Sequence, residues 1–309
     1  MSEKKELHPR NLHNTDYDLD LLASATPTLW QYIVEKFGKK TIDFTNPEAV
    51  KLLNTALLKQ YYGVDNWNIP SDFLCAPVPG RADYIHHIAD LLALNNEGEI
   101  PKGDVVNGLD IGVGANLIYP LLGNAIYGWN FVATDIDKRA VRNCVTIIEK
   151  NAHLQEAISL QLQPNPRFIF KDIIAEDDRF TFTICNPPFH ASAESAAKAA
   201  ARKNENLIVS NKNKAAALNF GGQNAELYCE GGELGFVTQM IYESAKYKKQ
   251  VLWFTSLVSK TENVHKLSNI LKKVAAADVK VIEMAQGNKK SRFIAWTFQS
   301  SDQQRNWNF

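Results

Sequence analysis

Short apolar segments alternate with helical segments from residue 105 onward, and this alternation limits the possible folds more than any other feature of the chain. Apolar runs of about four to eight residues predict buried strands, and strands that alternate with helices predict a mostly parallel sheet covered on both faces. Strands are expected at 106–111, 130–134, 167–170, 180–185, 250–257, 279–284 and 293–298, with helices at 138–150, 233–247 and 264–276 between them. The last two strands follow each other closely, which predicts an antiparallel edge. The expected fold is therefore α/β and Rossmann-like, with a doubly wound sheet of seven mostly parallel strands.

The chain before this sheet has a different pattern. A helix is expected to begin at Pro47 with Asn46 as its N-cap, because proline suits the first helical position. Further helical periodicity up to Leu94 predicts an N-terminal helical extension. The expected segments are an extended arm at 1–25, the helical extension at 26–104, the sheet domain at 105–300 and a tail at 301–309.

Charge is balanced overall but unevenly distributed. The 34 Lys and Arg residues equal the 34 Asp and Glu residues, so no global basic field attracts nucleic acid. Residues 246–292, however, hold eleven basic and three acidic residues, a net charge of +8. This asymmetry predicts a local basic surface in the C-terminal part of the chain.

The four cysteines are far apart in the sequence and form no CxxC pair: Cys75, Cys144, Cys185 and Cys229. This spacing favours reduced thiols in a cytoplasmic protein over a disulfide framework, and no metal site is expected. The first ten residues are polar, and no apolar stretch approaches the length of a membrane span. We therefore expect a cytoplasmic protein without a membrane segment.

A glycine-containing turn follows the first expected strand. Gly112 and Gly114 lie in the stretch 109–116, where glycines allow close approach of a ligand to the backbone. A dinucleotide fingerprint would place a third glycine at position 117, but Leu117 is there. The glycines alone are equally typical of a tight turn between a strand and a helix.

Acidic residues at the ends of the next strands favour a cofactor site over a plain turn. Asp135 and Ile136 follow about 20 residues after the glycines, where a carboxylate can accept hydrogen bonds from ribose hydroxyls. Asp172 follows the third expected strand and could meet an adenine amino group. A loop carboxylate and a helix N-cap are the structural alternatives for Asp135 and Asp172. With Asp110 just before the turn, the pattern resembles class I methyltransferases that use S-adenosylmethionine (SAM).

The stretch Asn186-Pro187-Pro188-Phe189 directly follows the fourth expected strand. The carboxyl ends of the strands are where open α/β sheets bind ligands. The stretch resembles the corresponding loop of methyltransferases that act on the amino groups of adenine, cytosine or glutamine. The Asn186 side-chain oxygen and the Pro187 carbonyl can accept the two N–H bonds of such an amine, and Phe189 can stack on a base. The alternative is a turn followed by a buried aromatic residue.

Further blocks along nearly the whole chain resemble the bacterial RlmF family, which forms N6-methyladenosine in 23S ribosomal RNA, and more distantly a eukaryotic methyltransferase of spliceosomal RNA. These blocks are 7–11, 42–44 with 46–47, 73–75, 77–87, 109–116, 185–190, 217–223, 253–259, 283–287 and 291–298. The resemblance implies SAM as cofactor and 23S ribosomal RNA, or a large-subunit assembly intermediate, as partner.

The same resemblance implies roles for individual residues. Arg81 would bind the methionine carboxylate of the cofactor, and the other cofactor residues would be Asp110, Gly112, Gly114, Asn116, Asp135, Ile136, Asp172 and Asn186. RNA would be contacted by His8, Arg10, Asn11, Lys289, Lys290 and Arg292.

Other functions stay open from the residues alone. The same pocket chemistry could serve another RNA, a DNA base or a protein glutamine, and the chain could be a non-catalytic ribosome-assembly factor. A nicotinamide oxidoreductase is disfavoured by Leu117. We expect a monomer, since nothing in the sequence demands a dimer.

Overall fold

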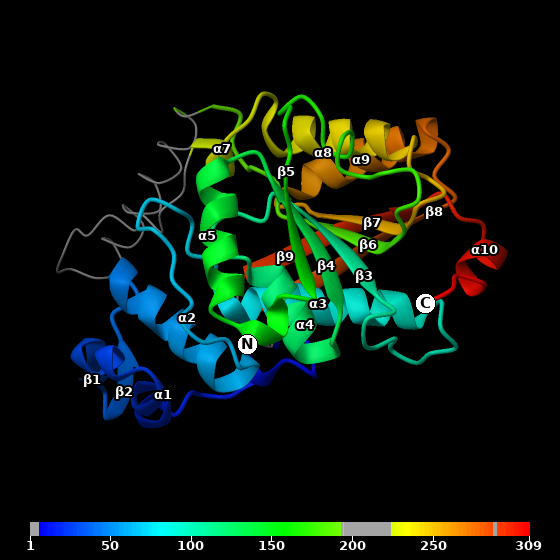
Figure 1. Cartoon of the computed structure of the whole chain (residues 1–309). Helices are drawn as coiled ribbons and strands as arrows, with labels where there is room; N and C mark the ends of the chain where they lie inside the picture. Colours follow the sequence, from blue (N-terminus) through cyan, green and yellow to red (C-terminus); the bar gives the residue numbers. More distant parts are fainter. Residues whose placement is uncertain (1–5, 193, 195–223, 287–288) are drawn as a thin grey trace, which may run out of the picture.

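The structure, a computed structural model of the chain, describes residues 6–192, 194, 224–286 and 289–309. At its centre lies a seven-stranded sheet in the order β5-β4-β3-β6-β7-β9-β8 (Figure 1). The strands are β3 (Asn107–Ile111), β4 (Asn130–Asp135), β5 (Ile158–Leu162), β6 (Phe180–Cys185), β7 (Val251–Leu257), β8 (Asp278–Gln286) and β9 (Lys289–Thr297). Neighbours among β3 to β7 pair in parallel, whereas β9 is antiparallel to both β7 and β8. The predicted parallel sheet with an antiparallel edge is confirmed.

The third strand was predicted at the wrong place. It is β5 at 158–162, where Ile158, Leu160 and Leu162 alternate with polar residues, and not at 167–170. The backbone N–H groups of Ile169 and Phe170 donate to the Glu243 carboxylate instead of to a neighbouring strand. Ile169 and Phe170 are apolar because they are buried in a turn that packs in one apolar cluster with residues of the helix at 232–244.

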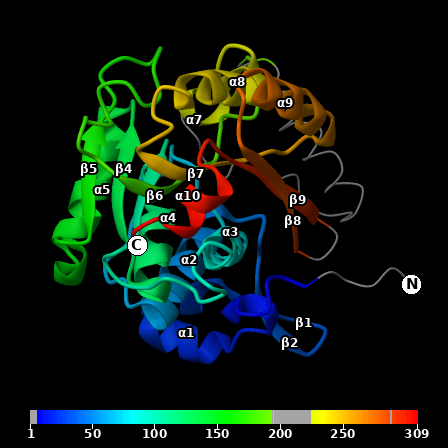
Figure 2. The same ribbon diagram turned by 90° about the vertical axis from the view of Figure 1, so that its right-hand side faces the viewer.

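Helices cover both faces of the sheet, which is why every residue of β6 and β7 is buried (Figures 1 and 2). One apolar cluster joins the sheet to α3 (Val78–Ala93), α4 (Ile118–Tyr127) and α5 (Lys138–Glu149). A second cluster joins it to α8 (Gly232–Ser244) and α9 (Thr261–Lys273). Shorter helices are η3 (Ala152–Leu154), α7 (Asn224–Leu227) and, in the tail, α10 (Ser301–Arg305). No helix of the described residues is long and apolar enough to cross a membrane.

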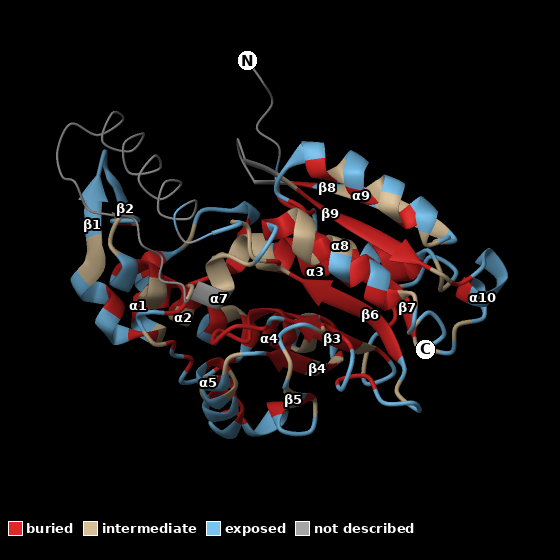
Figure 3. Cartoon of the chain, turned by 90° about the horizontal axis from the view of Figure 1, so that it is seen from above, coloured by how far each residue is buried: buried red, intermediate tan, exposed pale blue. Residues whose placement is uncertain are grey.

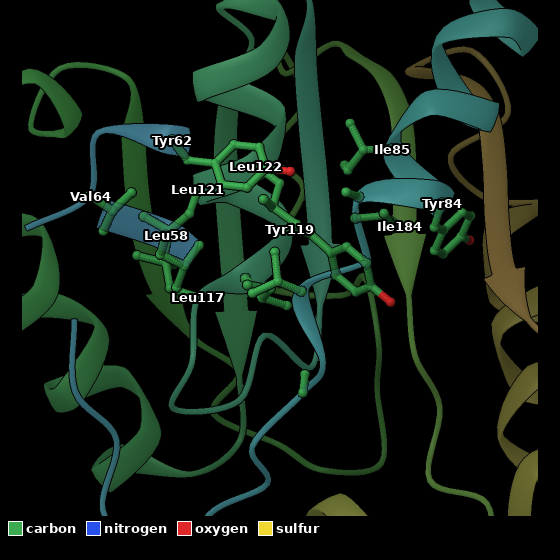
Figure 4. Close-up of a cluster of buried hydrophobic side chains, with 14 of the residues drawn as sticks. Leu58, Tyr62, Val64, Tyr84, Ile85, Leu117, Tyr119, Leu121, Leu122 and Ile184 are labelled. Atoms are coloured by element: carbon green, nitrogen blue, oxygen red, sulfur yellow. The ribbon is translucent and has the colours of Figure 1, made fainter. Parts of the chain in front are cut away.

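The N-terminal extension shares its core with the sheet. Its long helix α2 (Pro47–Tyr62) begins as predicted, since the Asn46 side chain accepts hydrogen bonds from two backbone N–H groups. Leu58 and Tyr62 of α2 meet Leu121 of α4, and the same buried cluster reaches Ile184 of β6 (Figure 4). Truncation of the extension would therefore expose part of the core that supports the sheet.

The extension was predicted to be helical, but it also contains two strands. A hairpin of β1 (Ile33–Lys36) and β2 (Lys39–Ile42) lies between η2 (Pro27–Tyr32) and α2. Gly38 in the turn and β-branched residues on both strands explain the hairpin. Figure 3 shows it as a largely exposed element at one end of the molecule.

The arm at 1–25 was predicted to be extended, but its described residues contain η1 (Leu12–Asn14) and α1 (Leu19–Ala25). It is held against α3: the His8 N–H donates to Asp83 Oδ1 at 2.6 Å, and Asn11 Nδ2 donates to the Pro79 carbonyl at 3.0 Å. The polar sequence predicted an extended arm because the partners that hold it lie about 70 residues away in the chain.

Candidate active site

A cavity of about 400 Å³ lies at the carboxyl ends of β3, β4 and β6. This volume is in the usual range for sites that bind small molecules. Among the residues predicted for the site, those that line the cavity are Arg81, Gly112, Gly114, Asn116, Asp135, Ile136, Asn186 and Pro188. Asp110, Asp172, Pro187 and Phe189 are not among the lining residues, and Asp172 is exposed.

The turn after β3 needs glycine for backbone reasons. Gly112 and Gly114 have φ angles of +70° and +64°, in the left-handed region. A Cβ atom at Gly114 would also lie 3.0 Å from Glu226 Oε1. The Asn116 side-chain oxygen accepts from the N–H of Ile118, the first residue of α4, at 3.0 Å. The turn is therefore a rigid floor for the cavity.

Asp135 joins this turn to the end of β4. Its Oδ2 accepts from the Gly114 N–H and its Oδ1 from the Asp137 N–H, each at 2.8 Å. Burial raises the pKa of Asp135, and the two backbone donors act in the opposite direction. The carboxylate is thus fixed at the cavity wall, where it can accept further hydrogen bonds.

Asp110 is a buried acid next to Ile111, which lines the cavity. Both of its carboxylate oxygens lack a hydrogen-bond partner among the described residues, and its exposure is 1%. Burial holds the pKa of Asp110 well above its usual range, with Asp135 acting in the same direction and Arg81 against it. Arg81 itself donates to the Tyr119 hydroxyl at 2.7 Å. A buried acid without partners beside a cavity fits a site that receives a positively charged group.

The Asn-Pro-Pro-Phe loop leaves β6 at the rim of this cavity. Asn186 Oδ1 is buried and has no hydrogen-bond partner among the described residues. The two prolines that follow it have no N–H to offer this oxygen. Asn186 therefore keeps a buried acceptor without a partner, and the residue lines the cavity.

A segment after α7 holds this loop in place. His190 N–H donates to the Leu227 carbonyl at 3.1 Å, and Cys229 N–H donates to the His190 carbonyl at 3.0 Å. A Cβ at Gly232 would lie 3.1 Å from the Ala191 nitrogen, so only glycine permits this close approach. Tyr228 of the same segment lines the cavity.

Glu243 of α8 holds the loop at 166–171, part of which lines the cavity. Its carboxylate accepts three consecutive backbone N–H groups, from Ile169 at 2.9 Å, Phe170 at 2.9 Å and Lys171 at 2.7 Å. The loop so held contributes residues 166–169 to the lining. One buried carboxylate therefore sets the position of this wall.

Known proteins resemble the chain over nearly its whole length. A family described as RNA methyltransferase matches residues 1–300. The chain belongs to this family. The ribosomal RNA large subunit methyltransferase F of Flavobacterium johnsoniae is 60% identical, covering 100% of this chain and 98% of the relative. The enzyme of the same name from Pseudomonas putida is 51% identical with the same coverage.

Solved structures agree with the methyltransferase family. The catalytic domain of hMettl16 in complex with the MAT2A 3′UTR hairpin 6 has a TM-score of 0.80 and 30% identity, covering 96% of this chain and 98% of that domain. The N-terminal domain of human METTL16 in complex with SAH has a TM-score of 0.76 and 29% identity, covering 96% and 100%. The predictions of a class I methyltransferase fold, of SAM as cofactor and of RNA methylation are confirmed.

In this methyltransferase, the arm residues predicted to contact RNA are engaged within the chain. His8 and Asn11 are buried, and His8 Nε2 lies 2.8 Å from Asp90 Oδ2. Arg10 donates to Asp90 Oδ1 at 2.5 Å and to the Tyr127 hydroxyl at 3.1 Å. Of the three, only Arg10 keeps substantial exposure.

The structure describes the side chain of only one of the three C-terminal residues predicted to contact RNA. Arg292 is buried, and its Nη1 donates to the Ser259 carbonyl at 3.3 Å. Lys289 and Lys290 begin β9, and their side chains lie outside the described residues. Contact of these residues with RNA stays a prediction.

Sequence reasoning missed several residues of the methyltransferase site. Those that line the cavity include Phe73, Leu74, Tyr119, Glu226, Tyr228, Phe236 and Gln239. The Gly231-Gly232 pair, which permits the contact with the Asn186 loop, was a signal that could have indicated the 226–232 segment. No local signal marks Glu243, because the N–H groups that it accepts lie more than 70 residues away.

Proposed function

We propose that this protein transfers a methyl group from SAM to the exocyclic N6 of a specific adenine in 23S ribosomal RNA. The observation that carries the proposal is the buried Asn186 oxygen, which has no hydrogen-bond partner among the described residues. Asn186 begins the corner Asn186-Pro187-Pro188, where the chain turns after β6. This corner borders the same cavity as Arg81 and Asp135. Support for the substrate comes from relatives at 60% and 51% identity, which are named ribosomal RNA large subunit methyltransferase F.

The residues of the cavity fit the cofactor. The left-handed backbone at Gly112 leaves open space, since no atom lies within 4 Å of where a Cβ would be. The Asp135 carboxylate would bind ribose hydroxyls, and the Arg81 guanidinium would bind a carboxylate. Asp110 would become the counter-charge for a bound ammonium group, because a nearby cation favours the ionised form of the buried acid. When bound, SAM supplies an electrophilic methyl group on a sulfonium.

The Asn186 corner would prepare the adenine amine. The amine is a weak nucleophile because its lone pair is delocalised into the ring. Asn186 Oδ1 and the Pro187 carbonyl would accept its two N–H bonds and so favour a pyramidal nitrogen with a localised lone pair. They would also stabilise the positive charge that develops on nitrogen. Catalysis would therefore come from preorganised electrostatics. Loss of the Asn186 side chain would lower the rate of methyl transfer more than loss of any other residue of the corner.

Aromatic residues would hold the base. Phe189 follows Pro188, which lines the cavity, and Tyr228 lines it from the segment that pairs with this loop. Stacking on such rings contributes about 1–3 kcal/mol per base. A base in a duplex must be flipped out to reach the pocket, whereas a loop base is extracted at lower cost.

We propose further that the enzyme is cytoplasmic and acts as a monomer on large-subunit ribosomal RNA or an assembly intermediate. The division into an arm, an extension, a methyltransferase domain and a tail also stays a proposal.

Mass spectrometry of nuclease-digested 23S ribosomal RNA tests the proposal. RNA from cells without the gene should lack one N6-methyladenosine that the purified protein and SAM restore. Methylation of DNA, of another RNA or of a protein glutamine instead would support the corresponding alternative. Binding of the RNA without any transfer would indicate a non-catalytic assembly factor.

A further inference from the structure

The β1–β2 hairpin ends in a turn whose sequence does not suit its geometry. Lys36 pairs with Lys39, so the loop is only Phe37-Gly38, and both residues have positive φ angles, of 53° and 73°. Two-residue turns of this kind prefer Asn-Gly, because asparagine tolerates the left-handed region. A bulky side chain such as Phe in this region is an outlier. The backbone conformation at Phe37 is therefore strained.

No contact within the described part of the chain offsets this strain. The Phe37 side chain is 106% exposed, more than any other large hydrophobic side chain described. The strained turn position lowers the stability of the free protein, and the exposed ring contributes no burial that would offset this cost. Such a residue indicates a role outside the fold of the chain.

Other exposed aromatic residues gather nearby in the sequence. Among the described residues, the exposed aromatic side chains are Trp30, Phe37, Phe44 and Tyr242, and three of these four lie between residues 30 and 44. Clusters of exposed apolar side chains mark interaction surfaces. The hairpin lies at the end of the molecule opposite α10 and on the side of α7, whose Glu226 lines the cavity (Figures 1 and 3).

The charges around Phe37 indicate what the partner is. Lys36, Lys39 and Lys40 flank Phe37 along the hairpin, with Glu35 as the one acid of the two strands. Lys39 pairs with Asp16 at 3.1 Å and Lys40 with Asp20 at 2.5 Å. All four of these side chains are at least half exposed, so both pairs are weak and can be exchanged for phosphates. Lys36 has no ion-pair partner in the described structure.

We propose that the hairpin tip, residues 36–40, binds an unpaired nucleotide of the RNA substrate outside the active site. The Phe37 ring stacks on the base, and the lysines contact the adjacent phosphates. A ring exposed on both faces and flanked by lysines is the arrangement that binds single-stranded RNA without a base preference. The inference rests on the proposed function, since it assigns a second contact to the same RNA.

The experiment compares three variants at the tip by their affinity for deproteinised 23S ribosomal RNA in the presence of S-adenosylhomocysteine. Phe37→Asn introduces the preferred turn residue, so it should raise thermal stability while it weakens RNA binding about 5-fold to 100-fold. Phe37→Trp keeps a stacking ring and should retain the affinity within about 3-fold. Lys36→Gln should reduce the log–log salt dependence of binding by about 0.7, the value for one phosphate of a single strand.

Opposite changes in stability and binding separate this role from a folding defect. Unchanged RNA affinity of Phe37→Asn would overturn the proposal. So would intact binding of naked RNA combined with weaker methylation of assembly particles, because that result indicates a protein partner. If the unaltered protein failed to methylate any RNA, the proposed function would fail and not the hairpin contact alone. Tyr242→Ala, which removes an exposed ring of α8 outside residues 30–44, is the matched control and should bind the RNA normally.

Discussion

Asp135 Oδ2 accepts a hydrogen bond from the Gly114 N–H at 2.8 Å, which ties the end of β4 to the glycine turn after β3. This bond fixes the orientation of a carboxylate at the cavity wall. Gly114 and Asp135 are 21 residues apart in the chain, and the strands that they follow or end, β3 and β4, are adjacent in the sheet. The site is therefore built into the edge of the sheet.

Asp135→Asn should weaken binding of S-adenosylhomocysteine about 10-fold to 100-fold. Asparagine has one acceptor oxygen, so it cannot keep both backbone bonds and also accept from ribose hydroxyls. Isothermal titration calorimetry measures the affinity. Asp172→Asn is the control, because Asp172 is exposed and outside the cavity lining, and it should bind normally. Normal binding by Asp135→Asn would remove Asp135 from the cofactor site.

Asp110→Asn should change how stability depends on pH. Burial raises the folded-state pKa of Asp110 above its unfolded value, so between the two the folded protein keeps a proton that the unfolded chain releases. The free energy of unfolding then falls as pH rises through this window, by up to about 1.4 kcal/mol per pH unit. The asparagine variant should lose this slope. Urea unfolding of both proteins at several pH values between 5 and 8 would show it, and parallel profiles would contradict the interpretation.

Glu243→Gln should weaken cofactor binding with little effect on the chemical step. A glutamine cannot accept three backbone N–H groups with one oxygen, so the wall at 166–169 loosens. The KM for SAM should rise about 10-fold while kcat changes less than about 3-fold. Equal loss in kcat would assign Glu243 another role.

Glu233→Gln is the matched control for this variant. Glu233 lies on the same helix and is equally a buried carboxylate that accepts hydrogen bonds, including Asn263 Nδ2 at 2.8 Å. Its partners at 259–263 are outside the cavity lining. A similar rise in KM for both variants would indicate general destabilisation.

His13 should make the protein sensitive to acid. Burial lowers the pKa of His13 to about 4, and its Nε2 lies 2.7 Å from the Tyr62 hydroxyl. Below the unfolded pKa of about 6.5, the unfolded chain binds a proton that the folded protein does not. Stability is therefore present above pH 6.5 and is lost as the pH falls toward 4, by up to about 1.4 kcal/mol per unit.

His13→Gln should reduce this loss, as unfolding measured between pH 7 and 4.5 will show. His86, whose pKa burial also lowers to about 4, should contribute similarly. The exposed His153 is the control, and His153→Gln should leave the acid slope unchanged. An acid slope that is the same in the unaltered protein, in His13→Gln and in His86→Gln would exclude the two buried histidines as its source.

The parts of the fold that were predictable from the sequence depend on local signals. Asn46 and Pro47 fix the start of α2, and Asp135 ends a strand whose apolar residues are continuous. The strand expected at 167–170 was wrong because Glu243, distant in the sequence, takes its N–H groups. Docking of His8 depends on Asp83 and Asp90, which no local pattern reveals.

The candidate site shows the same division. The glycine turn and the Asn186 loop carry their own signatures, so their meeting at one edge followed from the order of strands. Tyr228 and Glu226 reach the cavity through a segment that pairs with His190, and this pairing has no sequence signature beyond two glycines. Asp172 was placed by the misassigned strand, and the structure leaves it exposed.

The central claim is that the buried Asn186 oxygen acts on the amine of the substrate. Its most direct test is the single-turnover rate of methyl transfer by Asn186→Ala on 23S ribosomal RNA, measured beside the affinity for S-adenosylhomocysteine. We predict a rate at least about 100-fold lower with cofactor affinity changed less than about 3-fold, and a smaller loss for Asn186→Asp, which keeps an acceptor. An unchanged rate, or equal loss of rate and cofactor affinity, would contradict the claim.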